Sequence, residues 1–153
     1  TLDIDVTVWV NDVEEMVLVE HLAKEFSCLV SNPSSFALET RVLPLRVFDF
    51  RVDIIFGGLP FEERAIRRAK RVELAGISVK VCSPEDLILH KIISERSKDL
   101  DDVRGIIGKL GKNLDRAYLD PLVLGLAEDL GKPQIKELYL ELASLAAFFL
   151  GQR

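Results

Sequence analysis

The sequence has few of the residues that mark secreted or zinc-stabilised proteins. Its 153 residues include two cysteines, Cys28 and Cys82, and neither lies in a CxxC or Cys/His pattern. Two such cysteines cannot build a disulfide framework, and their surroundings do not suggest a zinc site. The low cysteine content therefore predicts a reducing, cytoplasmic location.

The sequence also lacks a long apolar run and a secretion signal. The longest apolar stretch, residues 138–150, is interrupted by Glu141 and Ser144. It is shorter than the roughly 20 residues that cross a bilayer, so we expect a core helix and no membrane contact. The N-terminus shows no basic segment followed by an apolar one, so nothing indicates secretion.

What the sequence does contain is typical of an ordered globular protein. Hydrophobic residues make up 48% of the chain and charged residues 29%, with a formal net charge of −5. This length and composition predict a single domain over residues 1–153, with a sheet-containing core in residues 1–82 and a helical part in residues 83–153. Carboxylates gather near the N-terminus and in residues 95–102, whereas basic residues gather in residues 64–71.

The first half of the sequence predicts a mixture of strands and helices. Apolar and polar residues alternate over residues 3–10, which predicts a strand, and Asn11 or Asp12 can cap the following helix. That helix ends near Phe26, and Val13, Met16 and Val17 recur at helical spacing. Further elements follow from turn residues and apolar runs: a loop at 31–35, strands at 41–48 and 51–56, a helix at 61–69 and a hairpin at 72–74 and 77–81.

The second half is predicted to be helical. Ser83-Pro84 is a sharp helix start, because serine can cap and proline suits the first helical position. Breaks are expected near residues 97–99, 111–115, 120–121 and 131–133, and no strand is needed after Val81. The predicted fold class is α+β: a small mixed sheet with flanking helices, followed by a helical C-terminal half.

Three aspartates are candidates for metal binding. Asp3 and Asp5 are two residues apart on one strand and so share a face. Asp53 lies within the apolar run 52–56, where a lone carboxylate is costly to bury. If the two strands are neighbours, the three carboxylates can hold Mg²⁺ or Mn²⁺, since oxygen ligands favour these ions. The alternative is that Asp3 frays at a chain end, Asp5 is a solvated strand position, and Asp53 pairs with a nearby arginine, Arg51 or Arg46.

Four segments together resemble a known family. They are residues 1–8 (Thr-Leu-Asp-Ile-Asp-Val-Thr-Val), 52–57 (Val-Asp-Ile-Ile-Phe-Gly), 83–91 (Ser-Pro-Glu-Asp-Leu-Ile-Leu-His-Lys) and 96–103 (Arg-Ser-Lys-Asp-Leu-Asp-Asp-Val). They resemble the minimal and AbiEii-type nucleotidyltransferases of the DNA polymerase beta-like superfamily, and the resemblance spans about residues 1–107.

The resemblance implies a metal-dependent transfer of a nucleotide monophosphate from a nucleoside triphosphate (NTP) to RNA, most plausibly a transfer RNA, or to a protein. Asp3 and Asp5 match the family's metal pair, Asp53 its third carboxylate, and Lys91 the lysine near the triphosphate. Relatives include toxins of toxin–antitoxin pairs, so an antitoxin partner is an expectation. The family's Gly-Gly or Gly-Ser turn would lie upstream of Thr1. The alternative function is therefore a catalytically incomplete binding or regulatory module.

The helix after Ser83 places charged residues beside an apolar arc. Leu87, Ile88, Leu89 and Ile92 define that arc, with Lys91 on its shoulder and Glu95 and Arg96 within it. For Lys91 we favour contact with phosphate, and Arg96 is a second candidate nucleotide contact. The alternative for Arg96, with Asp99 and Asp102, is a structural ion pair that locks two helices.

A basic stripe is the last candidate site. Its members fall at helical spacing and could receive an RNA backbone, although a solvated face is the commoner explanation. They are Arg64, Arg67, Arg68 and Arg71. His21 and His90 each stand alone, without a second ligand at metal spacing. The helical residues 114–150 could also serve to dimerise or to dock a partner.

Overall fold

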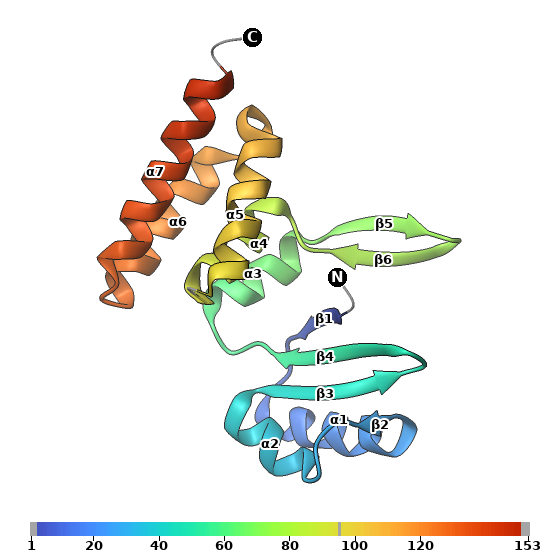
Figure 1. Ribbon diagram of the computed structural model, residues 1–153. Coiled ribbons are helices and arrows are strands. Elements are labelled where there is room, and N and C mark those ends of the chain that lie inside the picture. Colours follow the sequence, from blue (N-terminus) through green and yellow to red (C-terminus); the bar gives the residue numbers. More distant parts are fainter. Residues whose placement is uncertain (1–2, 95, 151–153) are drawn as a thin grey trace. The chain divides into compact units, whose positions relative to one another are not determined.

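The computed structural model describes the backbone of residues 3–94 and 96–150, and side chains as far as Ser144. The chain divides into two compact units, Thr1–Arg68 and Ala69–Arg153. The first, the sheet unit, holds the mixed sheet and its helices (Figure 1). The second, the helical unit, holds a hairpin followed by helices. The predicted fold class is confirmed.

The sheet unit is built around a four-stranded sheet with the strand order β1-β4-β3-β2. β1 pairs with β4 in parallel, whereas the β4–β3 and β3–β2 pairs are antiparallel. The first strand and the strand that carries Asp53 are therefore neighbours, as the metal-site hypothesis requires. The elements of this unit are β1 (Asp3–Val8), α1 (Asp12–Glu25), β2 (Ser27–Cys28), α2 (Pro33–Thr40), β3 (Val42–Val47), β4 (Phe50–Phe56) and α3 (Pro60–Arg68).

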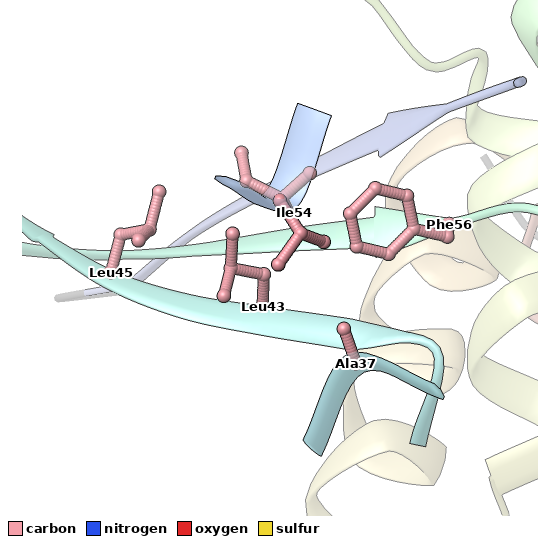
Figure 2. Close-up of a cluster of buried hydrophobic side chains, with 6 residues drawn as sticks. Ala37, Leu43, Leu45, Ile54 and Phe56 are labelled. Carbon is pink, nitrogen blue, oxygen red and sulfur yellow. The ribbon is translucent and has the colours of Figure 1, made fainter. Parts of the chain in front are cut away.

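One face of this sheet forms the hydrophobic core of the sheet unit. Side chains alternate between the two faces of a strand, and every second residue of β3 and β4 points into the core. Figure 2 shows five of these core side chains from α2, β3 and β4. The cluster consists of Val19 of α1, Ala37 of α2, Leu43, Leu45, Ile54 and Phe56. α1 and α2 thus cover one face, and the charged residues of β1 and β4 lie on the other.

Helix α1 begins with a complete capping box. The Asn11 side chain accepts a hydrogen bond from the backbone N–H of Glu14, and the Glu14 carboxylate accepts one from that of Asn11. The expected cap at Asn11 is confirmed, but the helical face predicted for α1 is wrong. Val13 and Val17 are exposed, and the helix buries Glu15 and Val19 instead. Apolar spacing alone could not identify the buried face of α1, because one of its buried residues is a glutamate.

Two short elements were missed by the sequence argument. Residues 31–35 were predicted to be a loop, yet helix α2 begins at Pro33, in the first-turn position that proline suits. The two-residue strand β2 pairs with β3, where Ser27 lies opposite Arg46. A strand of this length is too short to leave an alternating pattern in the sequence.

The helical unit begins with a hairpin, and no strand follows it among the described residues. The expected breaks near residues 97–99, 111–115 and 131–133 are confirmed, but the break at Asp120-Pro121 is wrong. The elements are β5 (Lys70–Leu74), β6 (Ile77–Val81), α4 (Pro84–Ser94), α5 (Ser97–Leu110), the 3₁₀ helix η1 (Gly111–Asn113), α6 (Arg116–Asp129) and α7 (Pro133–Leu150). No described helix is both long and apolar enough to span a bilayer.

A polar cluster explains how α6 continues through its proline. Pro121 lies in the second turn of α6, where it removes one backbone hydrogen bond. Asp120 accepts hydrogen bonds from Arg116 at 2.5 Å and from the Tyr139 hydroxyl at 2.6 Å, and the Arg116 guanidinium lies over the Tyr139 ring. These contacts fix the first turn of α6 to α7, and so tertiary contacts offset a local helix breaker.

Candidate functional site

The candidate site lies on the sheet face that α1 and α2 leave uncovered. In the parallel β1–β4 pair, Asp3 lies beside Arg51 and Asp5 lies beside Asp53. Residues in register on neighbouring strands share a face, and such strands are about 4.8 Å apart. Asp3, Asp5 and Asp53 therefore line one face of two adjacent strands, as the sequence predicted.

Arg51 supplies a cation among these carboxylates. Its Nε donates to both oxygens of Asp53, at 3.0 and 3.2 Å, and one terminal nitrogen donates to Oδ2 at 3.0 Å. The hydrogen bond to Asp53 raises the pKa of Arg51, and attraction to Asp53 and, more weakly, to Asp3 and Asp5 adds to the shift. The guanidinium thus lies in the field of all three carboxylates, and the expected structural pair Arg51–Asp53 is present.

The two β1 carboxylates have no such partner. Within the described part of the chain, neither the Asp3 nor the Asp5 side chain forms a hydrogen bond or an ion pair, and both residues are exposed. Asp53 is only 18% exposed. Two solvent-facing carboxylates beside a third, partly buried one create a site of concentrated negative charge that one arginine does not neutralise.

The donor set of this face suits a hard divalent cation. All three side chains offer carboxylate oxygens, the ligands that Mg²⁺ and Mn²⁺ prefer. As the side chains lie, no three His, Cys, Asp or Glu residues among those described are gathered closely enough to hold a metal ion. What the register supplies is a pair of neighbouring carboxylates, Asp5 beside Asp53.

Lys91 lies in the helical unit, in a network of ion pairs. Its amine donates to Asp99 at 3.1 Å and to Asp102 at 2.6 Å, which ties α4 to α5. Burial alone would lower the pKa of Lys91, but the hydrogen bonds to Asp102 and Asp99 outweigh it and raise the pKa. The expected role in phosphate binding is not visible in these contacts and stays a prediction.

Asp99 is the buried centre of that network. It also accepts hydrogen bonds from the Ser94 hydroxyl and from Nε of Arg96, both at 2.6 Å. Burial raises the pKa of Asp99, yet the hydrogen bonds from Ser94, Arg96 and Lys91 bring it down to about 2. Asp99 is therefore the expected partner of Arg96, the structural alternative that the sequence left open. Glu95, also expected on this helix face, lies outside the described residues.

The proposed basic stripe is not a single helix face. α3 ends at Arg68, and Arg71 lies on strand β5 in the other unit. Arg67 is held by an ion pair with Glu63 at 2.5 Å, one helical turn away. The helical spacing of the stripe does not correspond to a continuous helix beyond Arg68, because strand β5 begins at Lys70.

Arg41, which was not among the predicted site residues, binds the carboxyl end of β4. Arg41 donates from Nε to the carbonyl of Phe56 at 3.2 Å, and its guanidinium pairs with the buried Glu15 at 2.6 Å. Arg41 follows α2 with a left-handed φ of 59°. Apolar spacing gave no signal for Glu15, because Val13 and Val17 on the opposite side of α1 predict the wrong face as buried.

Comparison with known proteins identifies the class of protein to which the chain belongs. Residues 38–138, about two thirds of the chain, match the family described as nucleotidyl transferase of unknown function (DUF2204). The chain belongs to this family, and a nucleoside triphosphate is the substrate that nucleotidyl transfer implies. The match includes β4 with Asp53 and the network around Lys91, and it begins after β1. No curated protein matches the chain significantly.

Proposed function

We propose that the protein transfers a nucleotide monophosphate from an NTP to an RNA acceptor, such as a transfer RNA, with Mg²⁺ or Mn²⁺ held by Asp3, Asp5 and Asp53. The observation that carries the proposal is the β1–β4 register, in which Asp5 lies beside Asp53 on the uncovered sheet face. The donor set, oxygen only, suits these cations. Family membership supports the reaction type.

The roles of the protein's own groups follow from their surroundings. Asp3 and Asp5 are exposed and form no ion pair with any residue that the structure describes, so their charge is available to a cation. Arg51 holds Asp53 while the site is free of metal, which gives that partly buried carboxylate an ion-pair partner. When bound, a divalent cation would polarise the transferring phosphate and make the attacking hydroxyl easier to deprotonate. Displaced from Asp53, Arg51 would remain next to the negative charge of the substrate.

Substitution of the carboxylates tests the proposal. The protein is incubated with each labelled NTP, Mg²⁺ and total RNA, and label transfer and pyrophosphate release are measured. Asp5→Asn and Asp53→Asn should each lower the rate by more than about a hundredfold, because each removes a metal ligand. Asp49→Asn is the matched control, since Asp49 is an exposed aspartate of the β3–β4 turn. Equal rates for all three variants would disprove the assignment.

The choice of acceptor is tested in the same assay. Replacing RNA with a mixture of proteins distinguishes RNA from a protein side chain, the other acceptor that we consider. Co-expression with neighbouring genes would show whether one of them relieves growth arrest, as a toxin–antitoxin pair requires. Label on protein, with none on RNA, would overturn the RNA acceptor and leave the transfer reaction standing.

A second function, binding without catalysis, is favoured by one observation. Arg51 already neutralises Asp53 within β4, and a domain in which this pair is permanent would not need a metal there. In that case the carboxylate variants would bind NTP as the unsubstituted protein does, and no protein would release pyrophosphate.

A further inference from the structure

A second arginine lies on the candidate site's face. In the antiparallel β3–β4 pair, Arg46 of β3 lies directly opposite Arg51, and on its other side lies Ser27 of β2. Because paired residues share a face, Arg46 lies on the face of Asp53 and Asp5. Across this face the charges change in order, from the carboxylates of β1, through the Arg51–Asp53 pair of β4, to Arg46.

The two facing arginines differ in their partners. Arg51 is neutralised by Asp53, whereas Arg46 is exposed and has no hydrogen-bond or ion-pair partner in the described part of the chain. Most other described arginines do form ion pairs, among them Arg41, Arg67, Arg96, Arg104 and Arg116. The charge of Arg51 is compensated by Asp53, whereas the exposed guanidinium of Arg46 is solvated. Arg46 is therefore the cation of this face whose hydrogen-bond donors are available to an anion.

We infer that Arg46 binds a phosphate group of the substrate, beyond the reacting phosphate at β1 and β4. This inference rests on the proposed function, because it takes the carboxylates of β1 and β4 as the reaction centre. β3 is about 5 Å from β4 and about 10 Å from β1. An anion at Arg46 thus belongs to a molecule that extends across the sheet. The planar guanidinium fork fits phosphate oxygens in pairs, and its charge does not depend on pH.

Phosphate at this position has two sources in nucleotidyl transfer: the triphosphate of the donor and the backbone of a polynucleotide acceptor. Both present the same chemistry to Arg46, and separate binding experiments distinguish them. The probes are magnesium tripolyphosphate for the donor and a labelled single-stranded RNA oligonucleotide of mixed sequence for the acceptor. Neither probe depends on which base or which RNA is the natural substrate.

The test compares Arg46→Gln with Arg104→Gln. Both remove one positive charge, and Arg104 is an exposed arginine of α5 in the helical unit. If Arg46 contacts the acceptor, Arg46→Gln should reduce the slope of log K against log salt for the RNA by about 0.7, the value for one lost phosphate contact. If it contacts the donor, tripolyphosphate binding should weaken about tenfold. Arg46→Lys should restore part of either loss, since it keeps the charge without the fork.

Equal behaviour of Arg46→Gln and Arg104→Gln with both probes would overturn the inference, as would a protein that binds neither probe. A circular dichroism melt checks folding, and Arg46→Gln should be about as stable as the unsubstituted protein because the Arg46 side chain is exposed. The two proposals fail differently. If Arg46→Gln binds phosphate more weakly but the unsubstituted protein transfers no nucleotide, the Arg46 inference is supported and the proposed reaction is refuted. If the protein does transfer nucleotide and Arg46→Gln transfers it equally well, the reaction is supported and the Arg46 inference is refuted.

Discussion

At the scale of single residues, the sheet unit depends on two arginines that hold carboxylates. Arg41 pairs with Glu15, whose side chain is 1% exposed, and Arg51 pairs with Asp53. Burying a carboxylate without a partner is costly, so each arginine permits an acid where the fold would otherwise exclude it. The first pair joins α1 to the end of β4, and the second lies within the candidate site.

We predict that Arg41→Ala destabilises the sheet unit by about 2 kcal/mol. Removing one partner of a buried ion pair costs roughly 3–5 kcal/mol, and the cost is smaller here because the Arg41 side chain is 40% exposed to water. The left-handed backbone adds nothing to the difference, since alanine and arginine both carry a Cβ there. Urea unfolding measures the change, with Arg104→Ala as the control. A difference below about 0.5 kcal/mol between the two variants would contradict the prediction.

We predict that Arg51→Gln strengthens Mg²⁺ binding several-fold. The substitution removes the internal cation that competes for Asp53 and leaves three carboxylates with uncompensated repulsion. Isothermal titration of the protein with MgCl₂ at constant ionic strength measures the effect, and Arg104→Gln is the charge-matched control. Weaker binding in Arg51→Gln than in the control would mean that Arg51 supports the metal site and does not compete with it.

At the scale of elements, the Asp99 network joins α4 to α5, and its strength should depend on pH. Asp99 has a pKa of about 2 in the folded protein, lowered from the ordinary 3.8. Above pH 4 it is ionised in both the folded and the unfolded chain, and its lowered pKa contributes roughly 2 kcal/mol of stability. Between about pH 4 and pH 2 the unfolded chain takes up the proton first, so this contribution is lost as pH falls.

Acid unfolding of Asp99→Asn tests that window. We expect the variant to be less stable than the unsubstituted protein at pH 7 and to lose less stability between pH 4 and pH 2, because no carboxylate titrates at position 99. Asp101→Asn is the control, since Asp101 is an exposed neighbour paired only with Arg104. A pH dependence of equal size in both variants would show that other acids dominate in this range.

Elements with a strong local signal were predictable from the sequence, and those fixed by distant contacts were not. The alternation of β1, the cap at Asn11 and the helix start at Ser83-Pro84 depend on neighbouring residues alone. Pro121 looked like a break because the Tyr139 hydroxyl that binds Asp120 comes from another helix, α7. Arg71 fits the helical spacing of the basic stripe, but it lies beyond the helix predicted at 61–69, and the structure places it on β5.

The candidate site was predictable to a similar degree. The shared face of Asp3 and Asp5 follows from the period of a strand, and the parallel pairing with β4 agrees with the hypothesis that included Asp53. The sequence offered Arg51 and Arg46 as equal partners for Asp53. The side-chain contacts decide between them, because Arg51 donates hydrogen bonds to Asp53, whereas Arg46 lies opposite Arg51 on β3.

At the scale of the whole molecule, the chemistry proposed here divides between the two units. The three aspartates and Arg46 belong to the sheet unit, whereas Lys91 and its network belong to the helical unit. The family match covers β4 and most of the helical unit. A ligand that binds only folded protein should stabilise the unit that holds its site, and this provides a test of the metal site without any substrate.

We predict that saturating Mg²⁺ raises the unfolding temperature of the sheet unit. A ligand at a hundredfold excess over its dissociation constant adds about 2.7 kcal/mol, which corresponds to roughly 5–10 °C for a chain of 153 residues. The melt is compared with NaCl of equal ionic strength and with EDTA, since salt alone screens charges. Asp53→Asn should lose the shift, and Asp49→Asn should keep it. Hydrogen exchange of the backbone amides in β1 and β4 should slow when Mg²⁺ binds. Slowing confined to α4 and α5 would instead indicate that the metal binds at the Lys91 network.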